Sequence, residues 1–126
     1  MIELAIKSAL ERITGLDVYP LLLPDAEQEG ATFQRISDPA VGDGLTRTGL
    51  VAVRMQVCLY LVDDYTRLLQ LDAAIWSEWQ AIVQGELDGH PVQYISRGGI
   101  QQSKTTLTGG RTQYRLVRDF TLTVSE

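Results

Sequence analysis

The sequence predicts an α+β fold, in which an antiparallel or mixed sheet of about five strands carries a long helix and a short N-terminal helix packed on it. Three observations lead to this class. Apolar residues recur at helical spacing over residues 2–13 and again over residues 62–85. Between and after these stretches the spacing changes to alternation, which is typical of half-buried strands. Residues 1–126 are expected to form a single domain, because neither a linker nor an internal repeat interrupts them.

The first half of the chain is expected to supply one helix and three extended segments, over residues 2–13, 17–24, 31–37 and 50–61. Gly15 follows the helix at a position where helices commonly end. Pro20 and Pro24 exclude a helix from the second segment and make it an edge or irregular strand. The last segment is the clearest strand, because its alternating apolar residues share one face: Val51, Val53, Met55, Val57, Leu59 and Leu61.

Residues 38–47 are expected to form a flexible loop between two of these strands. The segment reads "DPAVGDGLTR", in which small and polar residues and two glycines follow a strand-breaking Asp-Pro pair. Hairpin loops are normally much shorter, and long ones tend to be functional or disordered. The loop is therefore a candidate contact region.

The second half begins with the long helix over residues 62–85, for which Asp63 or Asp64 is a suitable N-cap and Gly85 a suitable end. The rest of the chain predicts two long antiparallel strands. Their turn is expected near Gly109–Gly110, and a bulge or bend near Gly98–Gly99.

Charge is distributed unevenly within a net charge of −5. Residues 1–89 contain 14 acidic and 6 basic side chains, whereas residues 90–125 contain five basic side chains and Asp119 alone. The basic set could meet phosphate or an acidic partner, or it could simply be the solvent face of a hairpin. As a third interpretation, the acidic face of one copy meets the basic face of the next, which is a head-to-tail contact.

The residues that could support catalysis are few. His90 is the only histidine, and Cys58 is the only cysteine and lies within a predicted strand. The adjacent pair Asp63 and Asp64 suits a helix N-terminus better than an acid–base site. No zinc-ligand set is present, and the glycine-flanked segment around Lys104 lacks the order of a phosphate-binding loop. We therefore expect no enzyme activity, no metal and no cofactor.

The order of several segments resembles a known family. The segments are "GLDVYPLLLP", "ATFQRIS", "VAVRMQVCLYLVDDYTRLLQL" and "YRLVRDFTLTV". Together they resemble the tail terminator proteins (tail-completion or minor tail proteins) of long-tailed bacteriophages, including prophage versions. The resemblance implies a structural protein that forms a hexameric ring on the head-proximal end of the tail tube. Such a ring stops tube polymerisation and becomes part of the head–tail joint.

The resemblance also implies partners and a location. The partners are the tail tube protein, a head-completion or connector protein, and further copies of this chain. The protein would be found in the bacterial host cytoplasm during assembly and then in the virion tail. No membrane contact is expected, because no apolar stretch approaches the roughly 20 residues that span a bilayer.

Two groups of residues are candidate contacts with these partners, namely Asp38, Val41, Asp43, Leu45 and Arg47 in the loop, and Arg97, Lys104, Arg111, Arg115 and Arg118 in the last two strands. The loop is expected to be mobile in the free protein and to become ordered against the tube or a neighbouring subunit. The basic group is expected to face either a neighbouring subunit or the DNA in the lumen.

Two other classes of protein stay open at this point. One is a non-catalytic, ferredoxin-like binding or regulatory module of the bacterial cytosol, for which a stable dimer and a bound small molecule would be diagnostic. The other is a small enzyme that uses Asp63, Asp64 or His90, for which a deep pocket converging on those side chains would be diagnostic.

Overall fold

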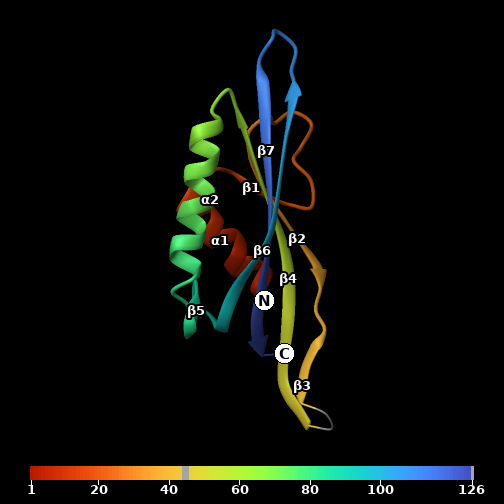
Figure 1. The fold of residues 1–126 in the computed structure, drawn as a ribbon, viewed down its shortest axis with the longest axis vertical. Helices are drawn as coiled ribbons and strands as arrows, with labels where there is room; N and C mark the ends of the chain where they lie inside the picture. The colour runs from red at the N-terminus through yellow and green to blue at the C-terminus, as the bar shows by residue number, and fades with distance from the viewer. Residues whose placement is uncertain (44–45, 126) are drawn as a thin grey trace.

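The structure, a computed structural model, describes the backbone of residues 1–43 and 46–125 and the side chains of residues 1–42 and 48–125. Within these residues the chain forms two helices and seven strands. In chain order they are α1 (Ile2–Thr14), β1 (Val18–Pro20), β2 (Gly30–Ser37), β3 (Ala40–Asp43), β4 (Thr46–Val62), α2 (Tyr65–Trp79), β5 (Val83–Leu87), β6 (His90–Thr106) and β7 (Thr112–Ser125). Figure 1 shows them in an elongated arrangement.

The predicted fold class is wrong, because the protein is much richer in sheet than a few-strand α+β fold. Strand accounts for 54% of it and helix for 23%. The described residues form one mixed sheet of seven strands, in which β1 and β2 are parallel and the other pairs are antiparallel. The strands that the sequence did not predict, β3 and β5, have four and five residues. Segments of this length are too short to give a clear alternating pattern.

Strand β5 replaces the predicted last turns of the long helix. Helix α2 ends at Trp79, whereas helical spacing predicted that it would continue to Gly85. Gln84 has a φ of 46°, which is incompatible with a right-handed helix. The chain instead forms β5, whose residues from Val83 to Leu87 pair with the start of β6.

Much of the predicted loop over residues 38–47 is also strand. Ala40 and Val41 pair with Val51 and Leu50, so that β3 and the first part of β4 form a hairpin. This pairing satisfies backbone groups that a flexible loop would leave to water. The expectation of a ten-residue flexible loop is therefore wrong for residues 40–43 and 46–47.

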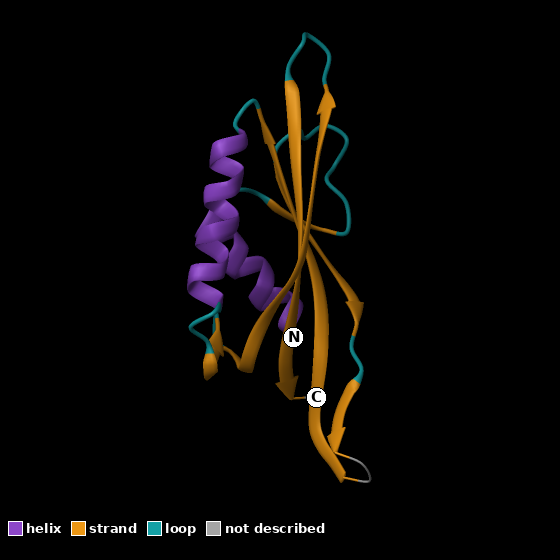
Figure 2. Cartoon of the chain, viewed as in Figure 1, coloured by secondary structure: helices purple, strands orange, loops and turns teal. Residues whose placement is uncertain are grey.

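The strands follow the order β1-β2-β4-β7-β6-β5, and β3 pairs with β4 outside this path. The two central strands stay in register from Leu50↔Ser125 to Val62↔Gln113. Figure 2 shows that strands extend beyond the helices at both ends of the molecule. We call these extensions the β3–β4 arm (residues 40–43 and 46–51) and the β6–β7 arm (residues 103–113), since Tyr65 at the start of α2 contacts Gln102 and Tyr114.

Both helices lie on the same face of the sheet, and the core lies between them and the sheet (Figure 2). The alternation predicted for β4 is confirmed, because its apolar residues at odd positions from Val53 to Leu61 are at most 1% exposed. From β7 the core receives Leu116, Phe120, Leu122 and Val124. Trp79 of α2 packs edge-on against Phe120 at 4.7 Å between ring centroids.

The features predicted at Gly15 and at Gly98–Gly99 are confirmed, unlike the helix end predicted at Gly85. Gly15 ends α1 in the left-handed conformation, with a φ of 70°. The register of β6 against β7 shifts between Arg97 and Ile100, which places a bulge at Gly98–Gly99. A Cβ at Gly98 would lie 3.1 Å from Cβ of Asp119, so a larger residue at the bulge would require Asp119 to shift slightly. Neither described helix has the length and apolar character needed to cross a bilayer.

Candidate functional site

Arg118, one of the five predicted contact residues in the last two strands, is buried under α2. Its Nε and Nη2 atoms donate hydrogen bonds to the two carboxylate oxygens of Asp72 at 3.2 and 2.7 Å. Both side chains are only 11% exposed. Arg118 thus fastens α2 to β7, and it cannot reach a partner or DNA without breaking this pair.

Two more of the predicted contact residues stack on aromatic rings. The guanidinium of Arg97 lies 5.0 Å from the ring centroid of Trp76, and that of Arg115 lies 5.9 Å from the ring centroid of Tyr60. Partial burial lowers the pKa of Arg115, but its contacts with Tyr60 and Cys58 outweigh this and raise the pKa above its ordinary value. These contacts tie both arginines to the sheet and α2.

Lys104 and Arg111 remain exposed on the β6–β7 arm, as the sequence predicted for a contact surface. Arg111 approaches Asp63 at 3.9 Å, which is a long separation for an ion pair between two exposed side chains. Lys104 takes part in no ion pair within the described part of the chain. The turn between the strands is closed by a hydrogen bond from Leu107 N to the carbonyl of Arg111 at 2.7 Å.

The other predicted contact residues belong to the opposite end of the molecule. Asp38 is exposed and accepts a hydrogen bond from Arg35 at 3.0 Å. Val41 lies in β3, where its carbonyl accepts a hydrogen bond from the Thr48 hydroxyl. Leu45 lies outside the described residues, as do the side chains of Asp43 and Arg47. The two predicted groups therefore do not form one site, since the arms point in opposite directions (Figure 1).

The sheet face away from the helices has a small open cavity beside the Gly98–Gly99 bulge. Its volume is about 190 Å³, and its lining includes Arg54, Gln56 and Gln101. Arg54 donates a hydrogen bond to Oδ2 of Asp119 at 2.6 Å, while the buried Oδ1 of Asp119 has no partner within the described residues. Arg54 and Asp119, which form this ion pair, both belong to the lining of the cavity.

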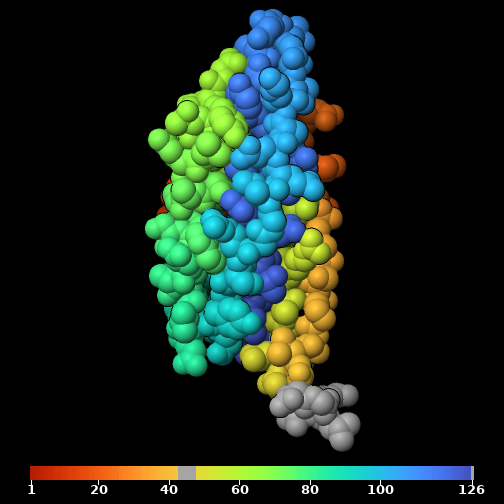
Figure 3. All heavy atoms as spheres, in the orientation of Figure 1, coloured from red at the N-terminus to blue at the C-terminus, as the bar shows by residue number. Residues whose placement is uncertain are grey.

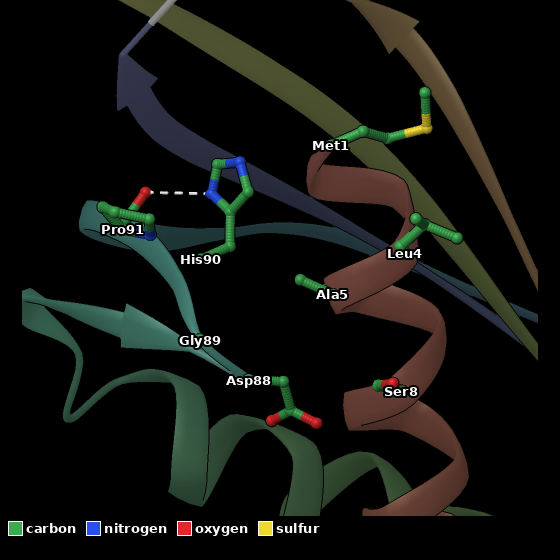
Figure 4. A pocket seen from close by; sticks show the side chains of 8 residues that line it. All are labelled: Met1, Leu4, Ala5, Ser8, Asp88, Gly89, His90 and Pro91. Atoms are coloured by element: carbon green, nitrogen blue, oxygen red, sulfur yellow. Dashed lines mark hydrogen bonds between the residues drawn. The ribbon is translucent and has the colours of Figure 1, made fainter.

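A larger hollow of about 300 Å³ lies between the start of α1 and the β5–β6 turn. Figure 4 shows its lining, with His90 and Asp88 on one wall and Leu4 on the other. Asp88 accepts a hydrogen bond from Arg12 at 2.7 Å, and Nδ1 of His90 lies 3.1 Å from its neighbour Pro91's carbonyl oxygen. Neither of these two hydrogen bonds joins a nucleophile to a base. Among its described residues, the hollow therefore presents no assembled catalytic pair.

The acidic pair at the start of α2 serves the backbone. Asp64 is the N-cap of the helix and accepts a hydrogen bond from Arg67 N at 3.0 Å. Asp63 accepts one from Thr112 N at 2.9 Å and donates its own N–H to the Thr112 carbonyl. The end of β4, which Asp63 follows, and the start of β6, which His90 begins, lie near opposite ends of the sheet (Figure 1). No group of three potential metal ligands occurs in the described residues.

One exposed feature escaped the sequence analysis. Leu21 and Leu22 are 62% and 79% exposed, and Leu21 adopts a φ of 69°, which is unusual for a leucine. A hydrogen bond from Leu22 N to the Pro20 carbonyl at 2.8 Å closes this tight turn. The flanking prolines, which we interpreted as excluding a helix and making an edge or irregular strand, were the available signal for such a turn.

Comparison with known proteins adds little to this description. No protein-family model and no curated protein matches the sequence. A solved structure whose name states no function aligns with 95% of this chain and 94% of its own, at 16% identity and a TM-score of 0.47. A similarity this weak carries no argument about function, which has to come from the geometry and from the resemblance in segment order.

Proposed function

We propose that this chain is a structural protein of a long-tailed bacteriophage or prophage, which caps the head-proximal end of the tail tube. In this role it stops tube polymerisation and forms part of the head–tail joint as a hexameric ring. Its partners are the tube protein, a head-completion or connector protein, and neighbouring copies of itself. The contacts would form in the host cytoplasm and persist in the virion.

The observation that carries the proposal is the pair of arms at opposite ends of one sheet. A cap at the end of a tube has to contact the tube on one side and the head on the other. The β3–β4 arm and the β6–β7 arm extend past the helices in opposite directions (Figure 2). Of the residues that the sequence singled out as contacts, Val41, Asp43 and Arg47 belong to the first arm, and Lys104 and Arg111 to the second. The segment order that resembles tail terminators supports the same interpretation.

Electron microscopy of tail tubes tests this function. The tail tube protein that this chain is proposed to cap is allowed to polymerise with and without gold-labelled copies of this chain. We expect label at one end of each tube and no further growth at that end. Label along the whole tube, or tubes that grow equally with and without the protein, would contradict the proposal.

A variant with a shortened β3–β4 arm tests whether the arm is needed for capping but not for folding. The Ala52 N–H donates to the Pro39 carbonyl at 2.9 Å, so an Asn-Gly turn can replace residues 40–51 at a point where the strands already pair. We expect the shortened chain to fold and to lose capping. Tubes of normal length with this variant would remove the arm from the mechanism.

The lumen DNA is the remaining candidate partner for the basic residues. Arg118 is held by Asp72, and Arg97 and Arg115 stack on aromatic rings, although Arg97 is itself exposed. Lys104 and Arg111 are the two exposed side chains that lack such a contact within the described residues and are the first candidates to meet DNA. Contact with phosphate would give a DNA affinity that falls steeply with salt. Absence of DNA binding at low salt would leave a neighbouring subunit as the partner of these two side chains.

A further inference from the structure

In the part of the chain that the structure describes, strand β6 has a paired strand on both sides only at Tyr94. β5 pairs with it as far as Tyr94, while β7 pairs with it from Tyr94 to Thr106. Among the residues that the structure describes, no strand lies beside residues 100–106 on the side away from β7. All seven of these residues are exposed, and Figure 3 shows β6 at the surface over this stretch. We call residues 100–106 the β6 edge.

Two hydrogen bonds fix which backbone groups of the β6 edge point outward. Leu107 N donates to the carbonyl of Arg111, so the backbone of Leu107 faces β7. Asp63 N donates to the carbonyl of Thr112, so Thr112 faces β4 and its sequence neighbours face β6. The register is unbroken over the β6 edge, and backbone direction alternates along a strand. The N–H and C=O groups directed away from β7 are therefore those of Ile100, Gln102, Lys104 and Thr106.

The opposite edge of the sheet is blocked, and the β6 edge is not. On the opposite side, β1 is only three residues long and ends in Pro20, Pro39 separates β2 from β3, and a bulge lies between Arg35 and Ser37. Short strands, prolines and bulges are the features that prevent unwanted strand pairing. The β6 edge contains no proline, and its bulge lies before its first residue. Its outward groups are thus available to an added strand.

The side chains around the β6 edge define what such a strand would contain. Tyr65 and Leu69 of α2 are 40% and 38% exposed, and the Tyr65 hydroxyl donates to the Gln102 side chain at 2.5 Å. This contact places the partly apolar end of α2 next to the helix-side face of the edge. Residues 97–111 carry three basic side chains and no acidic one. Apolar side chains at alternate positions, with acidic ones among them, would complement this surface.

We infer that the β6 edge binds an extended, acidic segment of another protein by strand addition. The added backbone pairs with the outward groups from Ile100 to Thr106. Lys104 pairs with Tyr114, whose ring lies 5.4 Å from that of Tyr65, so Lys104 shares the helix-side face with Gln102. On this face the added strand places apolar side chains toward Tyr65 and Leu69 and a carboxylate toward Lys104. The inference does not depend on tail capping, because it rests on the unpaired edge and the charge beside it.

Amide hydrogen exchange of the isolated chain tests the geometry first. In dilute solution, we expect the amides of Gln102 and Lys104 to exchange about tenfold or more faster than those of Gln101 and Ser103. Equal protection of the two sets would overturn the assignment of an open edge. Protection of Gln102 that rises with protein concentration would mean that a second copy occupies the edge, which would overturn the inference of a foreign segment.

A defined peptide then tests the occupant. The probe is a fluorescein-labelled nine-residue peptide, Thr-Val-Thr-Glu-Thr-Val-Thr-Glu-Thr, which places valine and glutamate on one face of the added strand and threonine on the other. Its control has lysine in place of each glutamate. We expect the acidic probe to bind with a Kd below about 1 mM and to slow exchange at Gln102 and Lys104. The lysine peptide should bind about tenfold more weakly or not at all. Equal binding of the two peptides, or no binding of the acidic one, would overturn the inference.

Three variants assign the binding to the edge. Lys104→Glu should weaken the acidic probe about fivefold and favour the lysine peptide, because it reverses one exposed charge. Gln102→Pro removes an outward N–H and should abolish binding without loss of the fold. Ser103→Pro removes an N–H directed at β7 and should instead lower the melting temperature. An acidic probe that binds Lys104→Glu as well as it binds the original chain would overturn the inference even if a proline variant fails to fold.

Discussion

The buried pair between Asp72 and Arg118 offers the most exacting test of the structure. Sequence alone placed Arg118 on a basic surface, whereas the structure places it under α2 with two hydrogen bonds to Asp72. The change Arg118→Met keeps most of the length of the side chain and removes the guanidinium. It leaves the Asp72 carboxylate in a site that is 11% exposed, without its partner.

The expected loss of stability follows from the burial of both groups. Removing one partner of a buried ion pair typically costs about 3–5 kcal/mol, because the other charge is left without compensation. Since each side chain here keeps some contact with water, we expect the lower end, about 3 kcal/mol. For a domain of this size, that corresponds to a fall in melting temperature of about 10 °C. Replacing both partners, as Arg118→Met with Asp72→Leu, should restore most of this loss.

Urea unfolding followed by tryptophan fluorescence measures these values, because Trp76 and Trp79 lie on the helix that the pair anchors. The midpoint should fall in Arg118→Met while the slope with urea stays constant, and it should recover in the double variant. A loss below about 1 kcal/mol in the single variant would indicate an exposed pair and refute the burial of Arg118. A double variant that loses the sum of both single effects would refute the coupling between the two side chains.

Two further predictions concern the start of the sheet and the first helix. Gly30→Ala should destabilise the chain by about 2 kcal/mol in thermal unfolding. Gly30 has a φ of 152°, and a Cβ there would lie 2.9 Å from Cδ1 of Leu23 and 3.0 Å from the Asp17 carbonyl oxygen. An unchanged melting temperature would contradict this crowding. Burial of Glu3 raises its pKa, but hydrogen bonds from Arg35 outweigh this and lower the pKa below its ordinary value of 4.5. A carboxyl whose pKa is lowered in the folded state stabilises it above the unfolded pKa, and this contribution is lost as pH falls through the lowered value. Glu3→Gln should therefore reduce the loss of stability between about pH 6 and pH 3, and identical pH profiles for the two proteins would exclude the ion pair.

The parts of the fold that could be predicted are those in which one face of an element is buried along its length. In β4, apolar residues alternate from Val53 to Leu61, because one side faces the helices. Short strands give no such signal. Val83 fits the apolar positions of a helix as well as those of a strand. That it lies in a strand depends on the left-handed backbone at Gln84 and on pairing with β6. Tertiary pairing of this kind is absent from local sequence.

The candidate site was predictable only in part, for a different reason. Charge can be counted in a sequence, but the partner of each charge cannot be identified. Arg118 and Asp72 are 46 positions apart in the chain, and Arg97 of β6 stacks on Trp76 of α2. Of the five side chains that suggested a basic surface, Arg97, Lys104 and Arg111 are exposed. The β6 edge was invisible in the sequence, since an unpaired strand side is a property of the assembled sheet.

The geometry of the central strands determines how the two arms can act. β4 pairs with β7 without a break from Leu50 to Val62, so a single ladder connects the residues beside β3 with those at the base of the β6–β7 arm. A continuous ladder resists bending at any one position, because every residue is fixed by hydrogen bonds and by buried neighbours on one face. The arms are therefore expected to hold a fixed separation and orientation. A partner bound at one arm would set the position of the other, which is the property that a joint between a tube and a head requires.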